Sequence, residues 1–156
     1  KTNVMRVLEQ KKIAYTAHTY PHEEGMAVDG VTVAKSMGFD PAIVFKTLVA
    51  RGASKQYYVF DVPVAENLDL KKAAKAVGEK SIEMIHQKEL LPLTGYVHGG
   101  CSPVGMKKLF PTVFHETAEN LETMIVSAGK IGYQVELAPR DLAALVRAKF
   151  ADIIVE

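Results

Sequence analysis

A lysine interrupts the apolar segment at residues 44–49, whose sequence is Val-Phe-Lys-Thr-Leu-Val. Lysine is almost never fully buried unless its charge is paired. If the segment is a strand, Lys46 shares one face with Leu48, whereas Phe45 and Thr47 lie on the other face. Two interpretations fit this spacing. Either Lys46 lies on the solvent face of an edge strand, or its amine points into a cleft.

A second candidate segment, residues 95–103, contains the consecutive glycines Gly99 and Gly100, followed by Cys101. Because glycine has no Cβ, the main-chain N–H groups of such a loop can approach a ligand closely. Amides in that position can bind a carbonyl oxygen on which negative charge develops. A plain turn before Pro103 explains the same residues equally well.

The common catalytic and metal-binding patterns are absent. The chain has no Gly-x-Ser-x-Gly elbow and no Gly-x-x-x-x-Gly-Lys-Ser/Thr phosphate loop. One cysteine cannot complete a structural zinc site, and no His-Glu-x-x-His spacing occurs among the histidines, which are His18, His22, His86, His98 and His115. We therefore expect no metal, no other cofactor and no triad chemistry.

Composition limits the cell compartment and the partners. The 156 residues fit one domain, and the single cysteine, Cys101, cannot form an internal disulfide, which favours a reducing compartment. No apolar run approaches the roughly 20 residues that span a bilayer, and residues 1–10 lack the apolar core of a secretory signal. We expect a cytoplasmic protein without a membrane partner.

The net charge of +1 does not by itself indicate a nucleic-acid partner. Any RNA contact would come from local clusters of lysines, and a solvated helix face explains each cluster as well. The candidates are Lys71, Lys72, Lys75 and Lys80, together with Lys107 and Lys108.

The elements that must position these residues follow from hydrophobic spacing, capping residues and turn residues. Helices are predicted from about residue 4 to 8, over 31–37, over 69–77 between Asp69 and Gly78, and from Pro139 onward. A short turn begins at Asp40-Pro41, and a helical turn at 87–91 is expected to break at Pro92. Strands are predicted at 13–20, 44–50, 56–63, 81–85, 95–100, 112–115, 123–127 and 133–137.

Because helices and strands are mixed without strict βαβ alternation, the sequence predicts an α+β fold. No repeat, low-complexity tract or linker divides the chain. We therefore expect one domain over residues 1–156.

Four separated motifs, in the same order, resemble the YbaK/EbsC family of aminoacyl-tRNA deacylases, which is related to the editing domain of bacterial prolyl-tRNA synthetases. The motifs lie at residues 45–48, 68–75, 94–103 and 126–130, and the resemblance extends over essentially the whole chain. It implies a barrel-like mixed β-sheet surrounded by helices. It also implies hydrolysis of the ester that joins a wrongly attached amino acid, usually cysteine on proline tRNA, to the tRNA 3′ end.

The resemblance also assigns site residues. Lys46 corresponds to the essential lysine of the family, which fixes the acyl ester or the terminal adenosine phosphate. Gly99, Gly100 and Cys101 correspond to the loop that contacts the aminoacyl group. The remaining substrate-binding positions of this region are Tyr20, Thr47 and Ser127. Mischarged tRNA is then the substrate, with prolyl-tRNA synthetase as the candidate protein partner.

The family mechanism needs no nucleophile from the protein, because the thiol of the substrate cysteine attacks its own ester. A free thiol has a pKa of about 8.5, so a few per cent is thiolate near neutral pH. Cys101 stands where relatives often have an aliphatic residue, which indicates a pocket-wall residue. Other departures leave open the roles of Asp29, His98 and Gln134.

Two alternative functions remain open at this level. One is removal of another small amino acid, such as alanine, because sister families share the lysine and the glycine loop. The other is a non-catalytic module that binds tRNA or a synthetase.

Overall fold

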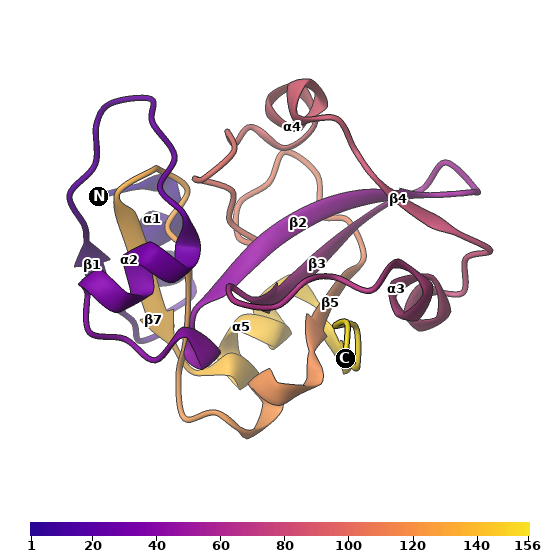
Figure 1. Cartoon of the computed structure of the whole chain (residues 1–156). Helices are drawn as coiled ribbons and strands as arrows, with labels where there is room; N and C mark the ends of the chain where they lie inside the picture. Colours follow the sequence, from indigo (N-terminus) through magenta and orange to yellow (C-terminus); the bar gives the residue numbers. More distant parts are fainter.

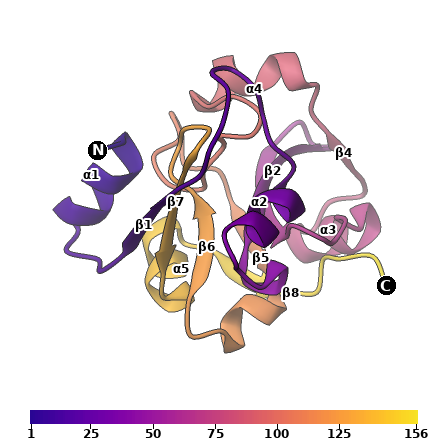
Figure 2. The ribbon, with the colours of Figure 1, turned by 60° about the vertical axis from the view of Figure 1, so that its left-hand side comes forward.

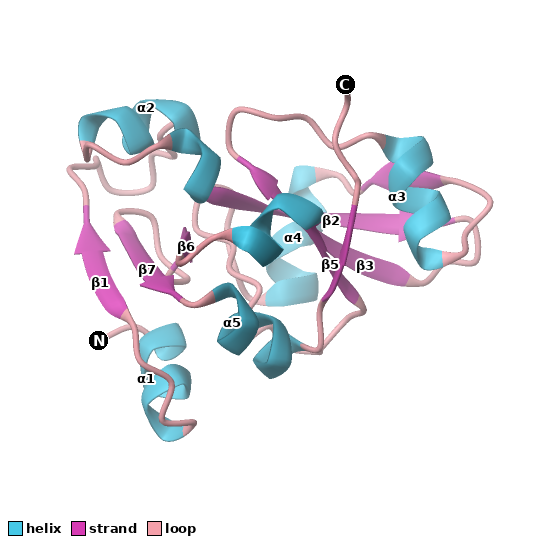
Figure 3. Cartoon of the chain, turned by 90° about the horizontal axis from the view of Figure 1, so that it is seen from below, coloured by secondary structure: helices cyan, strands magenta, loops and turns pink.

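The computed structural model describes residues 1–156, and the fold is of the α+β class (Figures 1 and 3). The helices are α1 (Asn3–Gln10), α2 (Gly30–Ser36), α3 (Leu70–Val77), α4 (Gln87–Thr94) and α5 (Pro139–Val146), with 3₁₀ turns η1 (Pro41–Ile43) and η2 (Glu116–Asn120). The strands are β1 (Thr16–Thr19), β2 (Phe45–Gly52), β3 (Tyr57–Pro63), β4 (Ile82–Met84), β5 (Thr112–His115), β6 (Met124–Ser127), β7 (Tyr133–Leu137) and β8 (Lys149–Ala151).

The strands form two sheets instead of the single barrel-like sheet that the resemblance implied. The smaller sheet has the antiparallel order β1-β7-β6, and the larger mixed sheet has the order β4-β2-β3-β5-β8. One isolated parallel bridge, Val44 to Ile125, connects them, and no further pairing closes a barrel (Figure 2). The mixed α+β class was therefore predicted correctly, and the barrel-like sheet does not close into a barrel.

Both sheets share one hydrophobic core. Phe45 and Val49 of β2 pack in the same buried cluster as Val126 of β6 and Val135 of β7, and α1 and α5 cover this cluster. A second cluster on the opposite face of the larger sheet lies under α3. The alternation expected for β2 is confirmed, because Phe45 and Val49 face the shared core while Leu48 packs toward α3.

Local capping signals predicted the helices well. Asp69 accepts a hydrogen bond from the Lys72 N–H (3.0 Å), and α3 ends at Gly78 in the left-handed conformation, as expected. The apolar stripe expected on α3 is incomplete, because Ala73 and Ala74 are buried but Leu70 is 41% exposed.

Two local predictions were wrong. Residues 95–100 do not form a strand, because Gly95 and Gly99 have positive φ angles (88° each) that turn the chain out of the extended conformation. Helix α4 does not break at Pro92. The helix continues through Pro92 to Thr94, and its last turn is completed by the Gly95 N–H, which donates to the Leu91 carbonyl (2.9 Å). None of the helices is both long and apolar enough to cross a membrane.

Candidate active site

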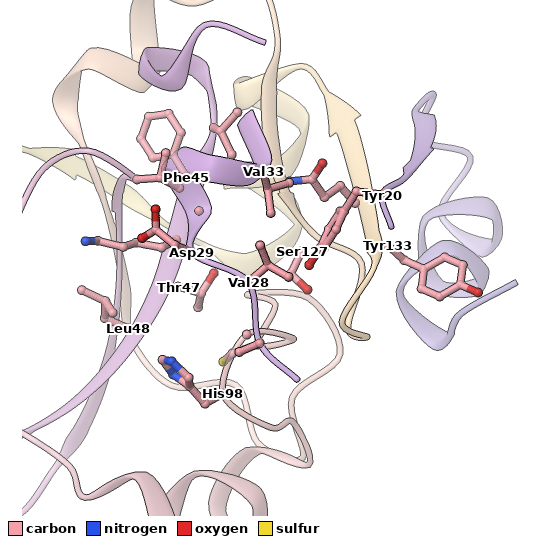
Figure 4. Close-up of a pocket in the computed structure, with 18 of the residues that line it drawn as sticks. Tyr20, Val28, Asp29, Val33, Phe45, Thr47, Leu48, His98, Ser127 and Tyr133 are labelled. Atoms are coloured by element: carbon pink, nitrogen blue, oxygen red, sulfur yellow. The ribbon is translucent and has the colours of Figure 1, made fainter. Parts of the chain in front are cut away.

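A cavity of about 510 Å³ lies where the two sheets meet, and residues from eight separated segments line it (Figure 4). This size is typical of a small-molecule site. Strand β2 forms one wall with residues 45–48, and the loop 27–30 before α2 forms another. The rest of the lining comes from Tyr20, Leu90, His98, Gly99, Cys101, Ser127, Tyr133 and Gln134, with Val33, Val44 and Val64. Six of the seven residues proposed from the sequence therefore line this cavity, and Gly100 does not.

Strand β2 places Lys46 at the cavity because only the second half of the strand is covered on its outer side. Strand β4 pairs with residues 50–52 of β2 and leaves residues 45–48 without a neighbour on that edge. Lys46 is therefore both an edge-strand lysine and a cavity residue, so the two interpretations of its spacing apply together.

The amine of Lys46 forms no ion pair within 4 Å and donates no hydrogen bond to the protein. Burial lowers the pKa of Lys46 from its usual value, and the charges of Asp29 and Glu66 oppose this shift. The amine is thus a hydrogen-bond donor without a partner at the cavity wall. A ligand with an oxygen acceptor can supply that partner.

Beside Lys46, Thr47 contacts a buried acid that sequence reasoning missed. Asp61 is directly opposite Thr47 in the β2–β3 register, and the Thr47 hydroxyl donates to Asp61 Oδ1 (2.5 Å). Asp61 is fully buried, its Oδ2 has no partner, and burial raises its pKa to about 7. When Asp61 is ionised, its carboxylate can only accept, so the Thr47 hydroxyl donates its one hydrogen to Asp61 and the Thr47 oxygen presents lone pairs to the cavity.

The glycine loop offers two free amides, although they are not those of both glycines. The N–H groups of Gly99 and Cys101 make no hydrogen bond within the protein, whereas the Gly100 N–H donates to the Val97 carbonyl (3.0 Å). A Cβ on Gly100 would also lie 3.0 Å from the Ile131 nitrogen, so Gly100 packs the loop against residues 130–131. Gly99 is needed for its positive φ of 88° and for its close contact with Ala27.

No protein nucleophile in the cavity is activated. Burial, with the nearby charge of Asp61, raises the pKa of the Cys101 thiol to about 12, so the thiol stays protonated at neutral pH. The Ser127 hydroxyl accepts from the Gly129 N–H (3.1 Å), and no histidine ring is hydrogen-bonded to Thr47, Cys101 or Ser127. The arrangement can bind and polarise an ester, but it does not contain a nucleophile–base pair.

The three residues whose roles the sequence left open have distinct environments. Asp29 caps α2 by accepting from the Thr32 N–H (3.2 Å), and it also lines the cavity near Lys46. Gln134 is buried and its Oε1 has no partner. His98 is exposed at the cavity mouth and makes no side-chain hydrogen bond. No group of three or more His, Cys, Asp or Glu side chains is placed to hold a metal ion.

The fold and the cavity define a class of protein, a small α+β domain with one cavity that a lysine and free main-chain amides line. The aminoacyl-tRNA editing domain family matches residues 22–145. The chain belongs to the aminoacyl-tRNA editing domain family. It is an enzyme, an aminoacyl-tRNA deacylase, and its substrate is tRNA that carries an amino acid.

Individual relatives agree with this assignment. A protein of Enterococcus faecalis, provisionally named Cys-tRNA(Pro)/Cys-tRNA(Cys) deacylase EbsC, is 46% identical over 153 residues, which cover 98% of this chain and 93% of that protein. A crystal structure provisionally described as a trans-editing enzyme for prolyl-tRNA synthetase has a TM-score of 0.81 and 25% identity, covering 98% of this chain and 97% of that one. A hypothetical protein with 18% identity and a TM-score of 0.86 covers 97% of this chain and 99% of its own, and shows the same fold.

The environment of Cys101 predicts the result of removing its thiol. Cys101→Ala is expected to keep deacylation within about threefold of the parent, because a protonated thiol is a poor nucleophile. Single-turnover deacylation of both proteins measures this ratio. Complete loss of activity, with an acyl-enzyme trapped on the parent by acid quench, would show instead that the protein supplies the nucleophile.

Proposed function

We propose that this chain acts in trans as one free-standing domain, residues 1–156, and removes cysteine from proline tRNA. The mischarged tRNA is a product of prolyl-tRNA synthetase, which we propose as the protein partner, in the cytoplasm where aminoacyl-tRNA is used. The relative named as a Cys-tRNA(Pro)/Cys-tRNA(Cys) deacylase supports this substrate, as does the neighbour described as a trans-editing enzyme for prolyl-tRNA synthetase.

The observation that carries the proposal is a cavity with an unpaired amine and free amides but no activated nucleophile. Hydrolysis of an ester then depends on a nucleophile that the substrate or water brings. Cysteine brings a thiol, and the enzyme needs only to position the ester and polarise its carbonyl.

In the proposed reaction the cysteine thiolate attacks the carbonyl carbon of its own ester. The new carbon–sulfur bond closes a cyclic thioester, the bond to the ribose oxygen breaks, and the thiol proton ends on that oxygen. Water then opens the cyclic thioester to free cysteine. Every atom of the product comes from the substrate and one water molecule.

Each wall of the cavity has a role in this reaction. The Lys46 ammonium fixes the ester, and the N–H groups of Gly99 and Cys101 donate to the carbonyl oxygen as charge develops on it. The lone pairs of Thr47 accept from the substrate ammonium group, since Asp61 holds the Thr47 proton. Tyr20 and Ser127 limit the size of the side chain that enters, and Gly100 holds the loop in shape.

The proposal predicts a strong dependence on sulfur. Proline tRNA charged with cysteine should be deacylated at least about 100-fold faster than the same tRNA charged with serine or alanine, because only cysteine carries a nucleophile of suitable pKa. Parallel assays with the three radiolabelled amino acids measure the ratio. Equal rates for alanine and cysteine would show attack by water and would reassign the enzyme to small amino acids in general.

A further inference from the structure

A second hollow, of about 430 Å³, lies beside the active-site cavity and has a different character. It contains four basic residues, no acidic residue and only one hydrophobic residue. We call it the basic cleft, and its lining is Lys1, Thr2, Asn3, Arg6, Thr94, Gly95, Tyr96, Gly105, Lys107, Gly129 and Lys130. For a chain with a net charge of +1, this is a local concentration of positive charge.

Three of the four cations are not neutralised by an acid. Lys1 forms an ion pair with Glu9 (2.7 Å), so its charge is compensated. Arg6, Lys107 and Lys130 have no carboxylate within 4 Å. The Lys107 amine donates to the Pro92 carbonyl (3.2 Å) at the end of α4, and the Lys130 amine lies 5.9 Å from the centre of the Tyr133 ring. These contacts hold the two amines in place and leave their charges uncompensated.

Three glycines line the basic cleft. Gly95, Gly105 and Gly129 all have positive φ angles. A Cβ on Gly129 would lie 2.9 Å from the Tyr96 ring, and one on Gly105 would lie 2.8 Å from the Tyr96 hydroxyl. Glycine is therefore required where the turns at Gly105 and Gly129 pack around Tyr96.

Two segments connect the basic cleft with the active-site cavity. Residues 94–96 line the cleft, and His98 and Gly99 line the cavity. On the other segment Ser127 lines the cavity, and Gly129 and Lys130 line the cleft. Because successive Cα atoms are 3.8 Å apart, Ser127 and Gly129 are separated by at most about 8 Å. If the 3′ end of an RNA strand occupies the cavity, the nucleotides next to that end are therefore within reach of the cleft.

We propose that the basic cleft binds backbone phosphates of the acceptor end of tRNA while the aminoacyl ester occupies the cavity. The proposal rests on the proposed function, because it is the ester in the cavity that places the RNA there. Clustered cations without acids are the electrostatic requirement for contact with a phosphate backbone. Arg6, Lys107 and Lys130 supply the charge-assisted hydrogen bonds.

The lysines of α3 are the competing RNA surface, and the structure disfavours them. Helix α3 lies on the opposite side of the molecule from α1 (Figures 1 and 2), and α1 contributes Asn3 and Arg6 to the basic cleft. Lys72 is also engaged, because its amine forms ion pairs with Asp152 (3.0 Å) and Glu156 (3.3 Å). Lys71, Lys75 and Lys80 remain exposed and make a control set of equal charge.

The cleft is tested directly by measuring the binding of proline tRNA that carries no amino acid. Fluorescence anisotropy gives the binding constant at salt concentrations between 50 and 200 mM. The triple variant Arg6→Gln, Lys107→Gln, Lys130→Gln is expected to bind at least about tenfold more weakly. When the logarithm of its binding constant is plotted against the logarithm of the salt concentration, the slope should be shallower by about 2 than that of the parent. The control variant Lys71→Gln, Lys75→Gln, Lys80→Gln should match the parent. Equal losses in both variants, or weaker binding with an unchanged slope, would overturn the proposal.

A catalytic comparison separates this proposal from the proposed function. On cysteinyl-tRNA the cleft variant should show a raised KM with kcat retained, whereas on the cysteinyl ester of adenosine, which has no phosphate, it should match the parent. If the parent cleaves neither substrate, the proposed function fails while the anisotropy result still decides the cleft. If the cleft variant matches the parent on both substrates, the cleft fails and the function stands.

Discussion

Lys46→Ala is expected to lower kcat/KM for deacylation of cysteinyl-tRNA by at least about 100-fold, while the protein remains folded. The loss follows from the position of the amine, which has no protein partner and faces the cavity. Misplacement of a reacting group by about 1 Å costs about 10²-fold in rate, and Lys46 is the group that fixes the ester. Stability should be unchanged or slightly higher, since burial lowers the pKa of Lys46 and its charge is therefore a cost to folding.

A matched control for this experiment is Lys75→Ala, which removes an exposed lysine of α3 outside the cavity. Single-turnover rates and thermal unfolding curves of both variants and the parent provide the comparison. Lys46→Arg adds a further test, because the guanidinium keeps the charge but changes the donor geometry. Parent-like turnover by a folded Lys46→Ala protein would remove this lysine from the mechanism.

Asp61→Asn is expected to stabilise the protein, and the gain should grow as pH rises. Burial raises the pKa of Asp61 from 3.8 to about 7, so the folded protein binds this proton more tightly than the unfolded chain. Stability is therefore lost as pH rises from about 4 and levels off above about 7. At 1.36 kcal/mol per pKa unit, the cost at pH 8 is on the order of 4 kcal/mol, and asparagine does not incur it.

Urea unfolding of the parent and of Asp61→Asn at pH 5 and pH 8 measures this effect. The difference in free energy of unfolding between the two proteins should increase by on the order of 2–3 kcal/mol from pH 5 to pH 8. Contributions of other groups cancel in this comparison, including that of His115, whose pKa burial lowers. Asparagine retains an oxygen acceptor for the Thr47 hydroxyl. A difference that does not change with pH would mean that Asp61 is not buried as a carboxyl group.

Local signals were sufficient for most elements. The helix between Asp69 and Gly78 and the paired strands β2 and β3 were predicted because a cap, a turn and an alternating pattern act within a few residues. Strand β8 was missed because it is only three residues long and exists through its pairing with β5. The expected strand at 95–100 failed because Gly95 and Gly99 adopt positive φ angles.

The sequence by itself determined the mixed fold class, the alternation along β2 and, through its motifs, the family. Tertiary structure alone decided that β4 leaves the edge beside Lys46 open and that Gly100 packs the loop while Gly99 lines the cavity. It also placed Asp61 opposite Thr47 and brought Arg6 close to Lys107 and Lys130. The physical reason is distance along the chain, because strand register and the packing of remote loops depend on contacts that no local window of sequence contains.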